Sequence, residues 1–186
     1  DTPPLVSSEV TVRVRDRNRY MKQNMEHMRM VNLSKTKLIY ALSAGSSGGA
    51  TTANTWQVRP LNFVEGNAAA QLALNTGNGQ ITLQPGVWDI EVKAVIGNAG
   101  NAKIRLYNIS GGGTFVTGTP QQPGTGEAGN GRLASLSGIR SVSSPTVIRL
   151  EQWRTYTSSY GMGWAVSVDG LAEIYTTISL QLIDSA

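Results

Sequence analysis

Four acidic residues in strand-like segments are the side chains of this chain that could do acid–base chemistry. Asp89 and Glu91 are two residues apart in a segment of alternating polarity. In a strand they share one face at about 6.5–7 Å, a separation at which paired carboxylates can hydrolyse a glycosidic bond. Their phase is opposite to that of Trp88 and Ile90, which directs them toward solvent or a neighbouring subunit. We therefore predict that the chain is not an enzyme and that these acids are structural or solvated: Asp89, Glu91, Glu151 and Glu173.

Glu151 and Glu173 also lie in polar phase within their segments, where Arg105, Arg149 or Arg154 could pair with them across a sheet. The residues of metal and nucleophile chemistry are scarce, since the chain has no Cys and a single histidine, His27. A catalytic triad or a zinc site needs histidine beside further partners. The Gly-rich stretches also lack the Gly-Lys-Ser/Thr ending of a phosphate loop. We predict no catalytic residue, no metal and no cofactor.

Aromatic side chains offer binding rather than catalysis. Exposed rings stack on the flat apolar faces of sugars, and the stretch from Arg154 to Tyr160 has the Ser- and Thr-rich composition of a loop. Its candidates for contact with a receptor, whether glycan or protein, are Arg154, Tyr156 and Tyr160. Trp56 and Trp164 are expected instead in the core, because large aromatic side chains are highly buried on average.

The net positive charge is confined to the leading segment. Residues 1–37 contain eight Lys or Arg and four Asp or Glu, whereas the rest of the chain contains eight of each kind. Four arginines stand at alternate positions, so in an extended chain their guanidiniums project from one side: Arg13, Arg15, Arg17 and Arg19. This stripe is suited to docking on acidic groups of a partner protein. It lacks the interleaved aromatic residues of a segment that reads nucleic acid.

The apolar spacing becomes helical after about residue 16, where Met21, Met25, Met28 and Val31 form one helix face. A short coiled-coil neck and a single helix packed on the body both fit this spacing. We expect residues 1–36 to be a basic arm with a short helical neck, and residues 37–186 to be the main domain.

That main domain shows short alternating segments separated by Gly-rich turns, which is typical of a sandwich or jelly roll. The Asp169-Gly170 pair is a hairpin signal between the last two segments. The expected strands are residues 37–42, 55–64, 80–83, 87–96, 102–109, 114–117, 132–142, 146–154, 163–168 and 171–183. The expected core is Trp88, Ile90, Val92, Ile104, Leu106, Val147, Ile148, Leu150, Ile174, Ile178 and Leu180, of which Val147 and Ile148 cannot share a face.

Three segments of the main domain are notable for their composition and order: LQPGVWDI (83–90), KIRLYNI (103–109), and GMGWA (161–165) followed by EIYTTI (173–178). In this order and spacing they resemble the trimeric C1q/TNF-like jelly-roll domains of bacteriophage tail fibres and related virion proteins. The resemblance implies an all-β, ten-stranded antiparallel jelly-roll sandwich. It also implies a homotrimer around a threefold axis, with a binding or structural role rather than catalysis.

The leading hypothesis is a non-enzymatic bacteriophage protein on the virion surface: the trimeric head of a tail fibre or spike, or a capsid-attached fibre, that attaches to the host surface. The alternative is a capsid decoration protein that clamps the shell through its N-terminal arm. In both, residues 1–36 bind other virion proteins. A glycan-processing enzyme domain and a secreted C1q-like signalling module are two further classes. The sequence contains no apolar run of about 18 residues that would predict a membrane span.

Overall fold

The computed structural model describes residues 35–66, 70–97, 100–121 and 132–185, together with positions 19 and 21. The chain divides into two units, Asp1–Leu33 and Ser34–Ala186, and the fold concerns the second. Within the described part of the chain, no helix has the length and apolar character needed to cross a membrane.

The described residues of the second unit form eleven strands. In chain order these are β1 (Thr36–Leu42), β2 (Gln57–Val58), β3 (Phe63–Glu65), β4 (Leu72–Asn75), β5 (Gln80–Leu83), β6 (Gly86–Ile96), β7 (Ala102–Asn108), β8 (Thr114–Thr117), β9 (Arg132–Val142), β10 (Thr146–Arg154) and β11 (Glu173–Asp184). The segments predicted over residues 80–83, 114–117, 132–142 and 146–154 have the predicted bounds.

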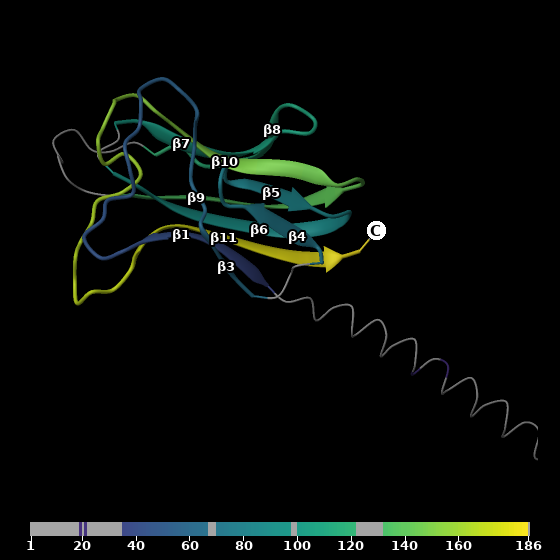
Figure 1. Ribbon diagram of the computed structural model, residues 1–186. Coiled ribbons are helices and arrows are strands. Elements are labelled where there is room, and N and C mark those ends of the chain that lie inside the picture. The colour runs from purple at the N-terminus through teal and green to yellow at the C-terminus, as the bar shows by residue number, and fades with distance from the viewer. Residues whose placement is uncertain are drawn as a thin grey trace, which may run out of the picture. The chain divides into compact units, whose positions relative to one another are not determined.

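The strands form two antiparallel sheets packed face to face. One sheet has the order β3-β1-β11-β6-β9, and the other has β4-β5-β10-β7-β8 with β2 pairing β10 beside β5. Figure 1 shows the two layers, with β7, β8 and β10 above and β1, β3 and β11 below. Consecutive strands β6 and β7 lie in different sheets, so the chain crosses between the layers as in a jelly roll. The predicted all-β jelly-roll fold is confirmed, but the described residues form eleven strands and not the ten predicted.

The core lies between the sheets and follows the alternation of the sequence. In β6 every second side chain from Gly86 to Ile96 is buried, because a strand directs successive side chains to opposite faces. Of the predicted core, nine side chains are at most 1% exposed: Trp88, Ile90, Val92, Ile104, Leu106, Ile148, Leu150, Ile178 and Leu180. Val147 is half-buried on the outer side, so Ile148 is the core member of that pair.

Ile174 is the one predicted core residue that is wrong, since 57% of it is exposed. The register between β1 and β11 shifts between Tyr40 and Ala41, so that Tyr40 faces Thr176 while Ala41 faces Ile174. This β-bulge moves the alternation by one residue. Tyr175 is buried as a result, and Ile174 points outward.

The strand predictions are wrong at three places, which are residues 55–64, residues 72–75 and residues 163–168. Residues 55–64 do not form one strand, because β2 pairs with β10 in one sheet whereas β3 pairs with β1 in the other. The chain crosses between the layers over Arg59 and Pro60, and proline has no N–H to give to a ladder. The short strand β4 was not predicted, because its consecutive apolar residues Leu72, Ala73 and Leu74 do not alternate with polar ones.

The predicted strand over residues 163–168 is also absent from the described fold. Asp169 and Gly170 do form the predicted tight turn, with positive φ angles of 51° and 69°. However, the N–H groups of Val166 and Ser167 donate to the Glu173 carboxylate instead of to a neighbouring strand. A strand cannot pair through N–H groups that a side chain already occupies.

Within residues 1–34, Arg19 and Met21 are described, and both are helical and exposed. The docking role predicted for the arginine stripe stays a prediction. Arg13, Arg15, Arg17 and His27 lie outside the described residues.

Candidate interaction surfaces

Loops from three parts of the chain meet at one end of the sandwich, here called the loop end: residues 43–56, Gly97 with residues 100–101, and residues 155–172. Thr51 and Ser158 exchange two backbone hydrogen bonds of 2.8 and 3.0 Å, and Gly48 N–H donates to Gly163 O at 3.0 Å. Thr155 N–H donates to Asn101 O at 3.0 Å. In Figure 1 the loop that precedes β11 lies away from the C-terminus. These cross-loop bonds make the loop end one continuous surface.

Three aromatic rings are exposed at the loop end: Tyr156 (67%), Tyr160 (41%) and Trp164 (40%). The rings of Tyr160 and Trp164 are in contact, with centroids 4.4 Å apart and planes inclined by 34°. The predicted exposure of Tyr156 and Tyr160 is confirmed. The predicted burial of Trp164 is wrong, because residues 163–168 follow the surface instead of forming a strand with an inner face.

Two glycines bring the chain close beneath these rings. A Cβ on Gly97 would lie 2.2 Å from Tyr160 O and 2.9 Å from the Trp164 ring, and one on Gly100 would lie 2.3 Å from the Tyr156 ring. Gly100 also has a φ of +55°, which favours glycine. Only residues without a side chain permit this packing, so the aromatic rings rest directly on backbone.

Arg154 is not on this surface, so its prediction as a receptor contact is corrected. It is fully buried and donates to the Thr51 hydroxyl beneath the loops. The reason is strand phase: Ile148, Leu150 and Arg154 are all buried along β10, so Arg154 follows the inner face. Desolvation lowers the pKa of its guanidinium.

A second buried arginine, Arg59, ties the loop end to both sheets. Its Nε donates to Thr176 Oγ1 at 3.0 Å, and its Nη2 donates to the carbonyls of Met162 and Tyr175, each at 3.1 Å. Its Nη1 donates to the Gln152 side chain, whose amide in turn donates to Gly161 O at 3.0 Å. Burial lowers the pKa of Arg59 to about 9. No spacing in the sequence identified this residue, because its partners come from distant segments.

Glu173 braces the outer part of the same loop. Its Oε1 accepts the N–H groups of Ser167 at 2.7 Å, Val166 at 2.9 Å and Gly45 at 3.3 Å. These hydrogen bonds, that of Ser167 first, hold the pKa of Glu173 below its usual value. The braced segment exposes three aliphatic side chains, Val166 (72%), Val168 (52%) and Leu171 (69%). Glu173 therefore has a structural role.

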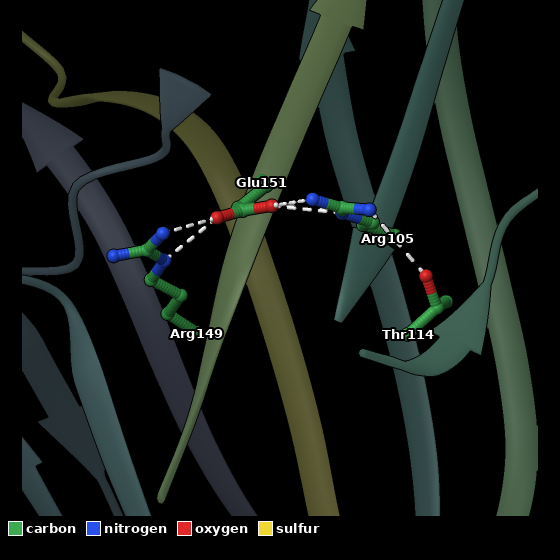
Figure 2. A network of polar contacts seen from close by, with 4 residues as sticks. All are labelled: Arg105, Thr114, Arg149 and Glu151. Atoms are coloured by element: carbon green, nitrogen blue, oxygen red, sulfur yellow. Dashed lines mark hydrogen bonds and ion pairs between the residues drawn. The ribbon is translucent and has the colours of Figure 1, made fainter. Parts of the chain in front are cut away.

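Glu151 lies on the outer face of the second sheet, between two arginines. Its Oε2 accepts Arg105 Nε at 2.8 Å and Nη2 at 2.7 Å, and its Oε1 accepts Arg149 Nε at 2.7 Å and Nη2 at 2.6 Å. Figure 2 shows the carboxylate with one oxygen toward each guanidinium, and Thr114 beyond Arg105. The predicted pairing with Arg105 and Arg149 is confirmed, whereas Arg154 points to the opposite side of the sheet.

Aromatic rings cover this network. The Arg105 guanidinium carbon lies 4.0 Å from the centroid of the Trp56 ring and 4.7 Å from that of Tyr107, distances at which a cation is attracted to a ring face. The Glu151 side chain is consequently only 2% exposed although it points away from the core. Trp56 is half-buried on this outer face rather than in the core as predicted. These contacts satisfy the acid on both sides, as expected of a structural carboxylate.

The outer surface of the β3-β1-β11-β6-β9 sheet, here called the five-stranded face, differs in exposing apolar side chains. Residues that face each other across antiparallel strands share one side of a sheet. Phe63 faces Ile39, Ile174 faces Ala41, and Leu133 faces Val95. The exposed members are Phe63 (57%), Leu133 (55%), Ile139 (59%) and Ile174 (57%).

Charged pairs also lie on the five-stranded face. Lys37 contacts Glu65 at 3.2 Å, and Glu91 contacts Lys93 at 2.9 Å and Lys35 at 3.6 Å. The hydrogen bond from Lys93 lowers the pKa of Glu91. Asp89 is exposed on the same face, opposite Ile139. Asp89 and Glu91 therefore lie on the outer side of the sheet, as their phase predicted.

In the described part of the chain, no three His, Cys, Asp or Glu side chains gather in a way that could hold a metal ion.

No family model matches the chain, and no curated protein matches its sequence. Its fold is similar to that of several solved structures. The globular domain of zebrafish complement 1qA protein is 13% identical with a TM-score of 0.55, over 83% of this chain and 100% of that one. Murine APRIL is 9% identical with a TM-score of 0.50, over 80% and 98%. Eiger TNF from S. frugiperda is 10% identical with a TM-score of 0.50, over 83% and 94%. At these identities the likeness establishes a C1q/TNF-like fold alone.

Proposed function

We propose that this chain is a non-enzymatic attachment module that assembles as a homotrimer through the five-stranded face and binds its target through the loop end. The observation that supports assembly is the contrast between the two outer sheet faces. One carries an acid sealed by arginines and rings. The other leaves Phe63, Leu133, Ile139 and Ile174 more than half exposed.

Several exposed apolar side chains on one face favour an interaction surface. The paired charges on the five-stranded face do not oppose association, since Lys35, Lys37, Glu65, Glu91 and Lys93 each have a partner of opposite sign. The resemblance to trimeric jelly-roll domains supports threefold assembly, in which a closed ring would bury the same face of every protomer.

Light scattering and sedimentation test the assembly. The wild-type chain should be trimeric at micromolar concentration. Ile174→Glu should dissociate it while the circular dichroism of the body is kept, since Ile174 is outside the core. Ala73→Glu is the matched control, because Ala73 is exposed in β4 of the other sheet. A monomeric wild type, or a trimer that tolerates Ile174→Glu, would contradict the proposal.

For the biological role, we propose a surface position on a bacteriophage virion, with the loop end facing the host and the basic segment of residues 1–36 anchored to other virion proteins. The sequence segments that resemble tail-fibre domains support this context, and the exposed rings at the loop end support target binding. The test is binding of the fluorescently labelled trimer to a panel of bacterial cells. Binding that Tyr156→Ala reduces is expected. Binding that this change leaves untouched would exclude the loop end as the attachment surface.

A further inference from the structure

We infer that the aromatic rings of the loop end form a site for an uncharged saccharide, with Tyr156, Tyr160 and Trp164 as its platform. This inference rests on the proposed attachment function and names the chemical class of the target.

The first observation is geometric. The Tyr160 and Trp164 rings are in contact, at a centroid distance of 4.4 Å and an inclination of 34°, so that they form one joined aromatic surface. All three rings are at least 40% exposed. A pyranose ring has an apolar C–H face that stacks on such rings, while its hydroxyls remain free for polar contacts. Each tyrosine also brings its own hydroxyl to the site.

The second observation is that the platform is fixed before any ligand binds. Gly97 brings backbone against the Trp164 ring, and Gly100 brings it against the Tyr156 ring. The chain between the rings is tied at Ser158 to Thr51 and at Gly163 to Gly48. Below it, Arg59 holds the Met162 carbonyl. Rings already held in place lose little rotational freedom on binding, and low ordering entropy favours affinity for a small ligand.

The third observation is charge, and it selects among partners. Residues 43–56 contain no charged residue, and residues 155–172 contain only Asp169. The two cations beneath them, Arg59 and Arg154, are fully buried. Phosphate, sialic acid, uronic acid and sulfate need exposed basic donors, as do nucleic acids. A neutral sugar needs no such donors.

The exposed hydroxyls near the rings fit the same partner. Thr157 and Ser159 are exposed between Tyr156 and Tyr160, and hydroxyls donate to and accept from sugar hydroxyls equally. The composition of this loop, rich in Tyr, Ser, Thr and Gly, combines rigid contact area with adaptable hydrogen bonding.

The experiment places the wild-type trimer on an array of immobilised oligosaccharides. Neutral oligomers of hexoses and N-acetylhexosamines stand beside sialylated, uronate-containing and sulfated ones. We expect binding to one or more neutral oligomers, with little change as salt is raised. Trp164→Ala and Tyr156→Ala should each weaken it roughly tenfold or more, the loss expected when a stacked ring is removed. Tyr156→Ala carries the test if Trp164→Ala disturbs the loop, because Tyr156 is the most exposed of the three.

Leu171→Ala is the matched control, since Leu171 is 69% exposed in the same loop but has no ring. It should leave binding within about twofold of wild type. Equal losses from Leu171→Ala and Tyr156→Ala would indicate a general apolar contact and overturn the saccharide site. Binding restricted to charged glycans would also overturn it. If the trimer binds bacterial cells but no oligosaccharide, the saccharide inference fails while the attachment function stands. If it binds neither, both fail.

Discussion

Arg59 is a cation buried among neutral acceptors, and replacing it with methionine tests whether the loop end depends on it. The side chain is fully buried. Its guanidinium donates to Thr176, Gln152, Met162 and Tyr175, none of which is acidic. Methionine fills a similar volume, so Arg59→Met removes the charge and the donors without a large cavity.

Two opposing contributions set the magnitude. Burial lowers the pKa of Arg59 to about 9, a shift that disfavours the buried cation by about 5 kcal/mol. Against it, hydrogen bonds to a charged group contribute roughly 1.5–3 kcal/mol each, and Arg59 makes bonds to four acceptors. The hydrogen bonds together stabilise the fold by more than desolvation of the cation destabilises it, so Arg59→Met should lower the free energy of unfolding by about 4 kcal/mol.

Urea unfolding at a fixed protomer concentration measures this difference, because an assembling protein's stability depends on concentration. Arg59→Lys should recover only part of it, since one ammonium cannot reach acceptors on all sides. Arg140→Met is the matched control: Arg140 is exposed and donates to the carbonyl of Phe115, so its loss should cost less than about 1 kcal/mol. If Arg59→Met were as stable as wild type, desolvation would outweigh the hydrogen bonds, as it does in some buried ion pairs.

The remaining predictions concern two acids and the leading segment. Glu151→Gln keeps the shape of the side chain but leaves Arg105 and Arg149 without a counter-charge. The urea midpoint should therefore fall by the equivalent of about 2–3 kcal/mol, and an unchanged midpoint would show that the ion pairs do not stabilise the fold. The pKa of Glu173 is lowered, so its bracing is complete above the unfolded pKa of about 4.3 and is lost as pH falls through the lower folded value. The fluorescence of Trp164 should report that acid transition, and Glu173→Gln should abolish the transition. Deleting residues 1–19 should leave the trimer intact but abolish virion attachment, which in the full chain should weaken with salt; an attachment that survives deletion would reduce the arm to a tether.

The long strands with regular alternation could be predicted from the sequence. Strand phase alone separates Trp88 from Asp89, because burial on one face of a sheet imposes a period of two. The prediction fails where the ladder is interrupted. The bulge that exposes Ile174 and the crossing of the chain at Arg59 both depend on which strands become neighbours, and no local pattern contains that information.

At the candidate site too, the properties set by local sequence were predictable and those set by strand neighbours were not. The exposure of Tyr156 and Tyr160 follows from the loop composition around them, which is local. Arg154 was misplaced because it was assigned to that loop, whereas the phase of β10 continues through it. The covering of Glu151 by Trp56 requires β2, β7 and β10 to lie side by side, which only the assembled sheet provides.

The distribution of charge connects the two proposed surfaces. Cations are buried beneath the proposed binding surface, and charges are paired on the proposed assembly surface. Arg59 and Arg154 sit beneath the loop end and stabilise it without presenting charge to a ligand, so the surface above them can be both rigid and neutral. On the five-stranded face, Lys37, Lys93 and Glu91 are each matched within one protomer, so association need not find new ionic partners. The two proposed surfaces meet at the start of β11, where Glu173 accepts hydrogen bonds from the loop and Ile174 points outward on the five-stranded face. A substitution at Ile174 therefore lies next to the residue that holds the loop in place.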